Sequence, residues 1–237
     1  MESWLVCLSV FLHLYFLFKI MKKKISILGS TGSIGLTSLS IIEKMKNGFK
    51  INILLANKNY KNISNQIKKY KPKYFVIKDK KVFLKIKKKF KNNKVKILNN
   101  LNFSTSQKKS DITISAIPGI AGLEPTIQMT KLSKKILLAN KESIICGWNL
   151  IRDAAKKNST KVIPVDSEHF SIMNLLSGHK LNEIEKIFIT ASGGPFLNFK
   201  VDQLKKISPQ DALNHPKWKM GKKITVDSST LINKIFE

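Results

Sequence analysis

The sequence predicts an α/β fold in which helices cover a parallel β-sheet. Three observations support this fold class. Short apolar runs rich in β-branched residues alternate with stretches of helical length. A glycine-rich turn at residues 29–35 separates the first of these runs from the first helical stretch. Of the 237 residues, 43% are hydrophobic and 24% charged, which suits a folded chain with a sizeable core rather than a disordered one.

The predicted elements follow the apolar periodicity along the chain. Residues 34–45 carry apolar side chains at helical spacing, and residues 142–156 form a helical stretch that closes the first half. The lysine-rich residues 78–96 keep a near-helical apolar spacing, which predicts a surface helix. The predicted strands are residues 25–28, 51–55, 74–77, 95–98, 112–114 and 136–139.

An apolar leader precedes these elements. Residues 3–18 contain no formally charged side chain, a run that is long for a signal-peptide core and slightly short for a membrane helix. Glu2 stands where a signal peptide carries a basic residue, and Met21 directly precedes three lysines and the first strand. We therefore interpret residues 1–20 as an untranslated leader or a mis-called start, in preference to a membrane anchor.

The chain is strongly basic, with 43 Lys and Arg against 15 Asp and Glu and a formal net charge of +28. Such a charge is typical of proteins that bind nucleic acid or anionic membranes. Arg152 is the only arginine, however, and arginine is the residue best suited to reading bases and binding phosphates. We attribute the lysines to AT-rich codon usage and expect no nucleic-acid partner. Cys7 and Cys146 form no CxxC pair, so we expect no disulfide, no zinc site and a cytoplasmic location.

The glycine-rich turn has the sequence Gly29-Ser30-Thr31-Gly32-Ser33-Ile34-Gly35. Its glycines let the backbone approach a pyrophosphate, whose charge is met by the amides and dipole at the N-terminus of the following helix. A lone glycine pattern would be an ordinary turn, but here strand, turn, helix and second strand occur in order. We therefore predict a Rossmann-like dinucleotide-binding domain over residues 21–150 and a second domain over residues 151–237.

The end of the second predicted strand distinguishes between dinucleotides. A free adenosine ribose is normally held there by an acidic side chain, but residues 55–59 contain no carboxylate. Lys58 offers a cation to a 2′-phosphate instead. The sequence therefore favours NADP over NAD, and the missing carboxylate carries more of this inference than one lysine in a lysine-rich chain.

Two carboxylates follow a short predicted strand at residues 162–165. On an extended segment, Asp166 and Glu168 would project to the same side and could bind one Mg²⁺ or Mn²⁺. Asp166 or Ser167 could equally cap the helix predicted over residues 170–176. The spacing leaves both interpretations open.

Six separated motifs are spread over both halves of the chain. They are GSTGSIG at 29–35, LANKES at 138–143, PVDSEH at 164–169, TASGGPF at 190–196, NHPKWKM at 214–220 and ITVDSSTLINKIFE at 224–237. In that order they resemble 1-deoxy-D-xylulose 5-phosphate reductoisomerases, and the match runs from Met21 to the last residue. The resemblance implies conversion of that phosphosugar to 2-C-methyl-D-erythritol 4-phosphate for isoprenoid synthesis. It further implies NADPH, a divalent metal (Mn²⁺, Mg²⁺ or Co²⁺), a homodimer for the full-length family, and an incomplete α+β catalytic domain after the Rossmann-like one.

The resemblance also implies roles for individual residues, matched motif by motif. Lys141, Glu168 and His215 would be catalytic. The metal ligands would be Asp166, Glu168 and Glu237. The cofactor contacts would be Thr31, Gly32, Ser33, Ile34, Lys58, Asn59, Asn140, Glu142 and Gly221. The substrate contacts would be Lys141, Ser167, Glu168, Ser192, His215, Ser228, Asn233, Lys234 and Glu237.

Further expectations concern the two serine segments, the segment around His215 and the loop at Asn57. Ser192 lies beside two glycines and Ser228 precedes a helix predicted over residues 230–237, so hydroxyls, amides and Lys234 could converge on a phosphate. The segment around His215 resembles the family's flexible lid. Asn57 stands where the family usually has glycine.

Because the sequence ends at the predicted ligand Glu237, we expect this chain alone to be weak or inactive. A non-catalytic NADPH-binding remnant is the alternative.

Overall fold

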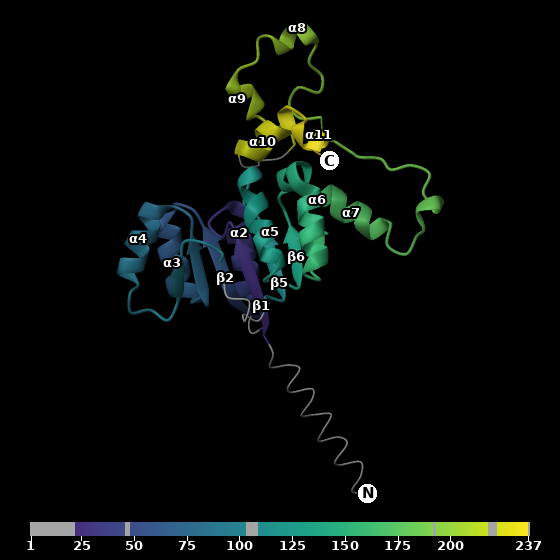
Figure 1. Ribbon diagram of the computed structural model, residues 1–237. Helices are drawn as coiled ribbons and strands as arrows, with labels where there is room; N and C mark the ends of the chain where they lie inside the picture. The colour runs from purple at the N-terminus through teal and green to yellow at the C-terminus, as the bar shows by residue number, and fades with distance from the viewer. Residues whose placement is uncertain (1–21, 46–47, 103–108, 192, 218–221, 237) are drawn as a thin grey trace, which may run out of the picture. The chain divides into compact units, whose positions relative to one another are not determined.

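The computed structural model describes residues 22–45, 48–102, 109–191, 193–217 and 222–236 (Figure 1). The chain divides between Val165 and Asp166 into two compact units. This division lies 15 residues beyond the boundary predicted near residue 150, because the strand at residues 161–164 pairs with the sheet of the first unit. The predicted leader lies outside the described residues. Within the described residues, no helix combines the length and apolar character needed to cross a membrane.

The first unit is a seven-stranded parallel sheet with strand order β4-β3-β2-β1-β5-β6-β7. This confirms the predicted α/β class, and all seven predicted strands form, including the one predicted at residues 162–165. The order reverses direction between β1 and β5, which is the point where open α/β sheets bind ligands. The strands are β1 (Lys23–Leu28), β2 (Phe49–Ala56), β3 (Tyr74–Ile77), β4 (Lys96–Leu98), β5 (Ile112–Ser115), β6 (Lys135–Leu138) and β7 (Lys161–Pro164).

Helices connect most successive strands and cover the two faces of the sheet (Figure 1); between β4 and β5 the described residues form no helix. Right-handed crossovers that lead from β1 toward β4 place their helices on one face, and those that lead from β5 toward β7 place theirs on the other. The first group is α2 (Ser33–Lys44), α3 (Tyr60–Tyr70) and α4 (Lys80–Lys89). The second is the short η1 (Ile120–Gly122) with α5 (Leu123–Thr130), followed by α6 (Lys141–Lys157).

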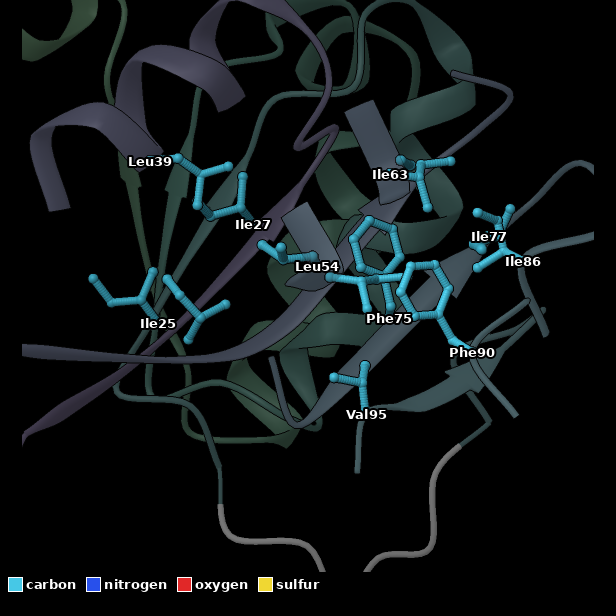
Figure 2. Packing of buried hydrophobic residues seen from close by; sticks show 13 residues of the cluster. Ile25, Ile27, Leu39, Leu54, Ile63, Phe75, Ile77, Ile86, Phe90 and Val95 are labelled. Atoms are coloured by element: carbon cyan, nitrogen blue, oxygen red, sulfur yellow. The ribbon is translucent and has the colours of Figure 1, made fainter. Parts of the chain in front are cut away.

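The larger core lies between the sheet and the first group of helices, as Figure 2 shows. Side chains alternate along each strand, so Leu54 of β2 and Phe75 of β3 enter this core while Leu55 and Val76 enter the core on the opposite face. Strands buried on both faces explain the continuous apolar runs in the sequence. The helices contribute Leu39 from α2, Ile63 and Ile67 from α3, and Ile86 from α4.

The second unit consists of short helices joined by irregular segments. Its described residues contain no β-strand, whereas an α+β domain was expected. A strand needs a neighbour to accept its hydrogen bonds, and the apolar segment around Phe188, which is 82% exposed, has none in the described unit. The helices are α7 (Ser167–Leu175), η2 (Leu181–Glu183), α8 (Val201–Leu204), α9 (Pro209–Ala212), α10 (Lys222–Ser229) and α11 (Ile232–Phe236).

Asp111 stabilises the amino end of the sheet. Its carboxylate accepts a hydrogen bond from the Lys24 main-chain N–H at 2.8 Å and pairs with the Lys134 ammonium at 2.8 Å. Burial acts to raise the pKa of the Asp111 carboxyl, but these two contacts outweigh it and hold the pKa below its usual value. A lowered folded pKa stabilises the fold above the ordinary carboxyl pKa, and this stabilisation is lost as pH falls through the folded value.

We expect Asp111→Asn to lower the free energy of unfolding by about 0.5–1 kcal/mol at neutral pH. The difference from the unaltered protein should disappear as pH falls through and below about 3.9, the ordinary pKa of the carboxyl. Urea unfolding at neutral and acidic pH measures both. Asp153→Asn, at an exposed carboxylate paired with the neighbouring Arg152, serves as the control and should change stability little. A difference independent of pH would contradict the expectation.

Candidate functional site

The glycine turn lies at the carboxyl end of β1. The main-chain N–H groups of Gly29 and Ser30 both donate to the Leu55 carbonyl of β2, at 2.9 Å. Gly29 has φ of +81°, and a Cβ there would lie 2.6 Å from the Ala116 carbonyl after β5. A Cβ on Gly35 would collide with the Gly29 carbonyl and lie 2.7 Å from the Ser30 Cα. The two glycines are therefore required for the turn to pack between β5 and α2.

The N-terminus of α2 is open for an anion. Gly32 is its N-cap and supplies no side chain to bond the first amides of the helix. Those amides and the positive end of the helix dipole attract a phosphate. The predicted contact residues surround this end: Gly32, Ser33 and Ile34 are exposed, and Thr31 is half-buried. The structure thus places all four at one end of α2.

A buried pair behind the turn was not predicted. Gln66 of α3 accepts a hydrogen bond from the Ser30 hydroxyl at 2.7 Å, and its amide donates to the Ser30 carbonyl at 2.8 Å. Gln66 is 4% exposed and lies between the buried Ile63 and Ile67. A glutamine within an apolar helical stripe was the available sequence signal.

The loop after β2 presents three exposed polar residues, Asn57, Lys58 and Asn59. Asn59 is the N-cap of α3, where its side chain accepts the Asn62 N–H at 3.1 Å. Asn57 does not adopt positive φ, so replacing the family's usual glycine leaves this loop unstrained. Lys58 was predicted to contact a 2′-phosphate, and Asn59 was predicted as a further cofactor contact.

Asn140 fastens the start of α6 to the loop that follows β5. Its side-chain oxygen accepts the Ser143 N–H at 2.8 Å, and its amide donates to the carbonyls of Ile117 and Gly119. Asn140 is 2% exposed, and this carboxamide is engaged within the protein. Its predicted cofactor contact remains a prediction. Lys141 and Glu142 follow as the first, half-buried residues of α6.

Asp166 is the N-cap of α7, and Glu168 lies in the first turn of that helix instead of on an extended segment. The Asp166 Oδ1 accepts the His169 main-chain N–H at 3.0 Å and contacts the His169 ring Nδ1 at 2.8 Å. The expectation of two carboxylates on one side of a strand is therefore wrong, because α7 begins at Ser167, three residues earlier than predicted. The capping interpretation is correct. His169 was not among the predicted site residues. The sequence signal for its contact with Asp166 is its position three residues after that acidic cap.

Glu168, in the first turn of α7, is paired with Lys234 of α11. The Lys234 ammonium lies 2.5 Å from Glu168 Oε1, and the Ser167 hydroxyl donates to Oε2 at 2.7 Å. Burial acts to raise the pKa of the Glu168 carboxyl, but these hydrogen bonds outweigh it and lower the pKa to about 2. Glu168 is therefore anionic throughout the physiological range.

The chemistry of these carboxylates suits a hard divalent cation. Both contacts of Asp166 are made through Oδ1, while both oxygens of Glu168 already have partners. Among the residues that the structure describes, no three His, Cys, Asp or Glu side chains are grouped as a metal centre requires. Glu237, the third predicted ligand, lies outside them.

The two serine-bearing segments approach each other at Gly194. Gly193 and Gly194 both have positive φ, and a Cβ on Gly194 would lie 2.7 Å from the Ser228 carbonyl. Ser228 was expected to lie just before a helix, but it is the penultimate residue of α10. A turn that includes Leu231, with φ of +56°, separates it from α11. The dipole at the end of α10 therefore disfavours a phosphate there, whereas the glycine loop against Ser228 remains compatible with one.

His215 is 9% exposed, and its Nδ1 accepts the Lys217 N–H at 3.1 Å. This bond orients the ring and leaves Nε2 as the protonated nitrogen of the neutral form. Several predictions fall beyond the described residues and are not tested. They are Ser192, Gly221, Glu237, the lid residues after Lys217 and the side chain of Asn233.

Family models match both units of the chain. One described as 1-deoxy-D-xylulose 5-phosphate reductoisomerase matches residues 25–147, and one described as the C-terminal domain of that enzyme matches residues 162–237. A curated protein of the same description from Pelagibacter ubique is 51% identical over 220 residues, which cover 91% of this chain and 56% of that protein.

Solved structures agree with these matches. The reductoisomerase from Zymomonas mobilis in complex with NADPH superposes with a TM-score of 0.79 at 32% identity, covering 91% of this chain and 56% of that one. A DOX-P reductoisomerase in complex with NADPH, fosmidomycin and magnesium superposes with a TM-score of 0.77 at 32% identity, covering 90% and 56%. The chain thus spans little more than half the length of the relatives it matches.

Proposed function

Because the chain belongs to the 1-deoxy-D-xylulose 5-phosphate reductoisomerase family, we propose that it serves the reduction and rearrangement of that phosphosugar to 2-C-methyl-D-erythritol 4-phosphate. The observation that carries the proposal is the glycine turn, which ends at an uncapped helix N-terminus at the reversal point of the sheet. When bound, NADPH supplies a hydride and a divalent cation polarises the substrate ketone.

The residues of the first unit have the chemistry to hold NADPH. The turn and the first amides of α2 meet the pyrophosphate, and the exposed Lys58 meets the 2′-phosphate. Related structures in complex with NADPH support this assignment. Two asparagines named as cofactor contacts, Asn59 and Asn140, also cap helices, so they fix the loops on which other contacts stand.

The residues of the second unit have the chemistry to hold the metal and the phosphosugar. Asp166 and Glu168 would bind the cation, with Glu237 as a third ligand. The Lys234 ammonium, now paired with Glu168, is a cation for the substrate phosphate, and Ser228 offers a hydroxyl beside a glycine loop. His215, held through Nδ1, would present its other nitrogen as a donor.

A turnover assay tests the proposal. The full chain is mixed with 1-deoxy-D-xylulose 5-phosphate, Mn²⁺ and NADPH, and NADPH oxidation is followed by absorbance; NADPH binding is measured in parallel by fluorescence. Substrate-dependent oxidation that chelators abolish supports the proposal. Binding without turnover assigns this chain a cofactor-binding role alone, and the absence of both contradicts the proposal.

Lys58 should determine the preference for NADPH over NADH. We expect Lys58→Ala to weaken NADPH binding about 10-fold, because it removes a charged partner of the 2′-phosphate, and to leave NADH binding unchanged. Fluorescence titration with both cofactors measures this. Lys61→Ala, at an exposed lysine three residues further along, in the first turn of α3, is the matched control. Equal weakening of both cofactors would show that Lys58 has no role in selectivity.

A homodimer and a cytoplasmic location belong to the same proposal. Cys146 is an exposed free thiol, which suits a reducing compartment. Light scattering should give twice the chain mass of 26.9 kDa.

A further inference from the structure

We propose that Gln66 is a positioning residue for the dinucleotide turn: its carboxamide holds the Ser30–Thr31 peptide so that the Thr31 N–H faces the cofactor phosphates. This inference rests on the proposed function, since it assumes that the turn binds NADPH.

The contact between Gln66 and Ser30 is bidentate. The carboxamide oxygen accepts the Ser30 hydroxyl hydrogen bond at 2.7 Å, and the carboxamide nitrogen donates to the Ser30 carbonyl at 2.8 Å. Ser30 is completely buried and Gln66 is 4% exposed, so water does not compete for either bond. One side chain thus fixes both the side chain and the carbonyl of Ser30.

Holding a carbonyl fixes the N–H of the next residue. A trans peptide is planar, so its C=O and N–H point in opposite directions. The Ser30 carbonyl points to the buried Gln66, and the Thr31 N–H therefore points away from α3 and the protein interior. Across the described chain this N–H has no main-chain acceptor, while the neighbouring Gly32 N–H is used by the Gly29 carbonyl at 3.0 Å. The Thr31 N–H is thus placed to join the first amides of α2 around a phosphate.

Burial of a glutamine at this position is unfavourable unless its polar atoms are satisfied. Ile63 and Ile67, in adjacent turns of α3, are completely buried, and an apolar side chain would satisfy packing at position 66. What an apolar residue cannot do is orient the Ser30 peptide. The position of Gln66 therefore links α3 to the phosphate turn rather than only filling the core.

The test compares ligands that do and do not use the turn. NADPH and 2′-AMP share the adenosine 2′-phosphate, but 2′-AMP has no 5′-phosphate. In Gln66→Met, calorimetric titration should show NADPH binding about 10-fold weaker and 2′-AMP binding unchanged. Ser30→Ala removes one hydrogen bond but keeps the one that orients the peptide, so its NADPH affinity should change less than three-fold. Gln128→Met, on an unrelated helix, controls for the chemical change.

Each outcome separates this inference from the proposed function. Unchanged NADPH affinity in Gln66→Met, or equal losses for NADPH and 2′-AMP, would overturn the positioning role while leaving the function intact. If the unaltered protein does not bind NADPH, the proposed function fails and this inference with it. If Gln66→Met does not fold, Gln66→Asn, whose carboxamide is one methylene too short to reach Ser30, makes the same comparison.

Discussion

Gly35→Ala is expected to abolish measurable NADPH binding and to lower the free energy of unfolding by about 2–4 kcal/mol. The added methyl group would collide with the Gly29 carbonyl and the Ser30 backbone, 2.7 Å from the Ser30 Cα. Neither neighbour is a flexible side-chain end, so the turn or α2 must move. Urea unfolding and NADPH fluorescence measure the two effects.

Gly32→Ala is the matched control for this variant. A Cβ on Gly32 would lie 3.4 Å from the Gly29 carbonyl, an ordinary contact, and φ at Gly32 is −81°, which alanine adopts freely. Stability should therefore change by less than about 1 kcal/mol. NADPH binding should still weaken, because the methyl group projects from the exposed cap where the phosphates approach. Equal stability of the two variants would show that close packing of Gly35 does not hold the turn.

Glu168→Gln is expected to weaken Mn²⁺ binding by on the order of 100-fold, since it replaces the anionic carboxylate proposed as a metal ligand by a neutral amide. It also removes the partner of Lys234, whose ammonium lies 2.5 Å from Glu168 Oε1. Calorimetric titration of the full chain with Mn²⁺ measures the effect without reference to turnover.

Asp202→Asn is the control for loss of one negative charge. This carboxylate lies in the same unit, on α8, and its side chain is 92% exposed and paired only loosely with Lys205 at 3.5 Å. Its Mn²⁺ affinity should equal that of the unaltered protein. A Glu168→Gln variant that binds Mn²⁺ as well as this control would exclude Glu168 as a ligand.

Most of the sheet could be predicted because strands buried on both faces leave uninterrupted apolar runs in the sequence. Periodicity does not reveal which neighbour a strand selects, however. Residues 161–164 were expected to belong to the second domain, which was predicted to begin at residue 151, but they pair with β6 and form the edge of the first unit. That pairing depends on contacts between distant residues, which a single sequence does not display.

The site could be predicted less fully, for local reasons. Asp166 fits either a strand end or a helix cap, and only the hydrogen bonds to His169 decide between them. Ser228 lies in a helix whose sequence, KKITVDSS, contains β-branched residues and serines of low helix propensity. The contact between Gln66 and Ser30 could not be predicted, because it depends on how α3 packs against the turn and the neighbours of Gln66 in the sequence do not reveal that packing.

Asn140 joins two segments of the first unit that are distant in sequence. A single carboxamide bonds the amide of Ser143 in α6 and the carbonyls of Ile117 and Gly119 beyond β5. The beginning of α6, with Lys141 and Glu142, is therefore tied to the 117–119 segment through one buried carboxamide. The position of Lys141 thus depends on two separate stretches of the chain.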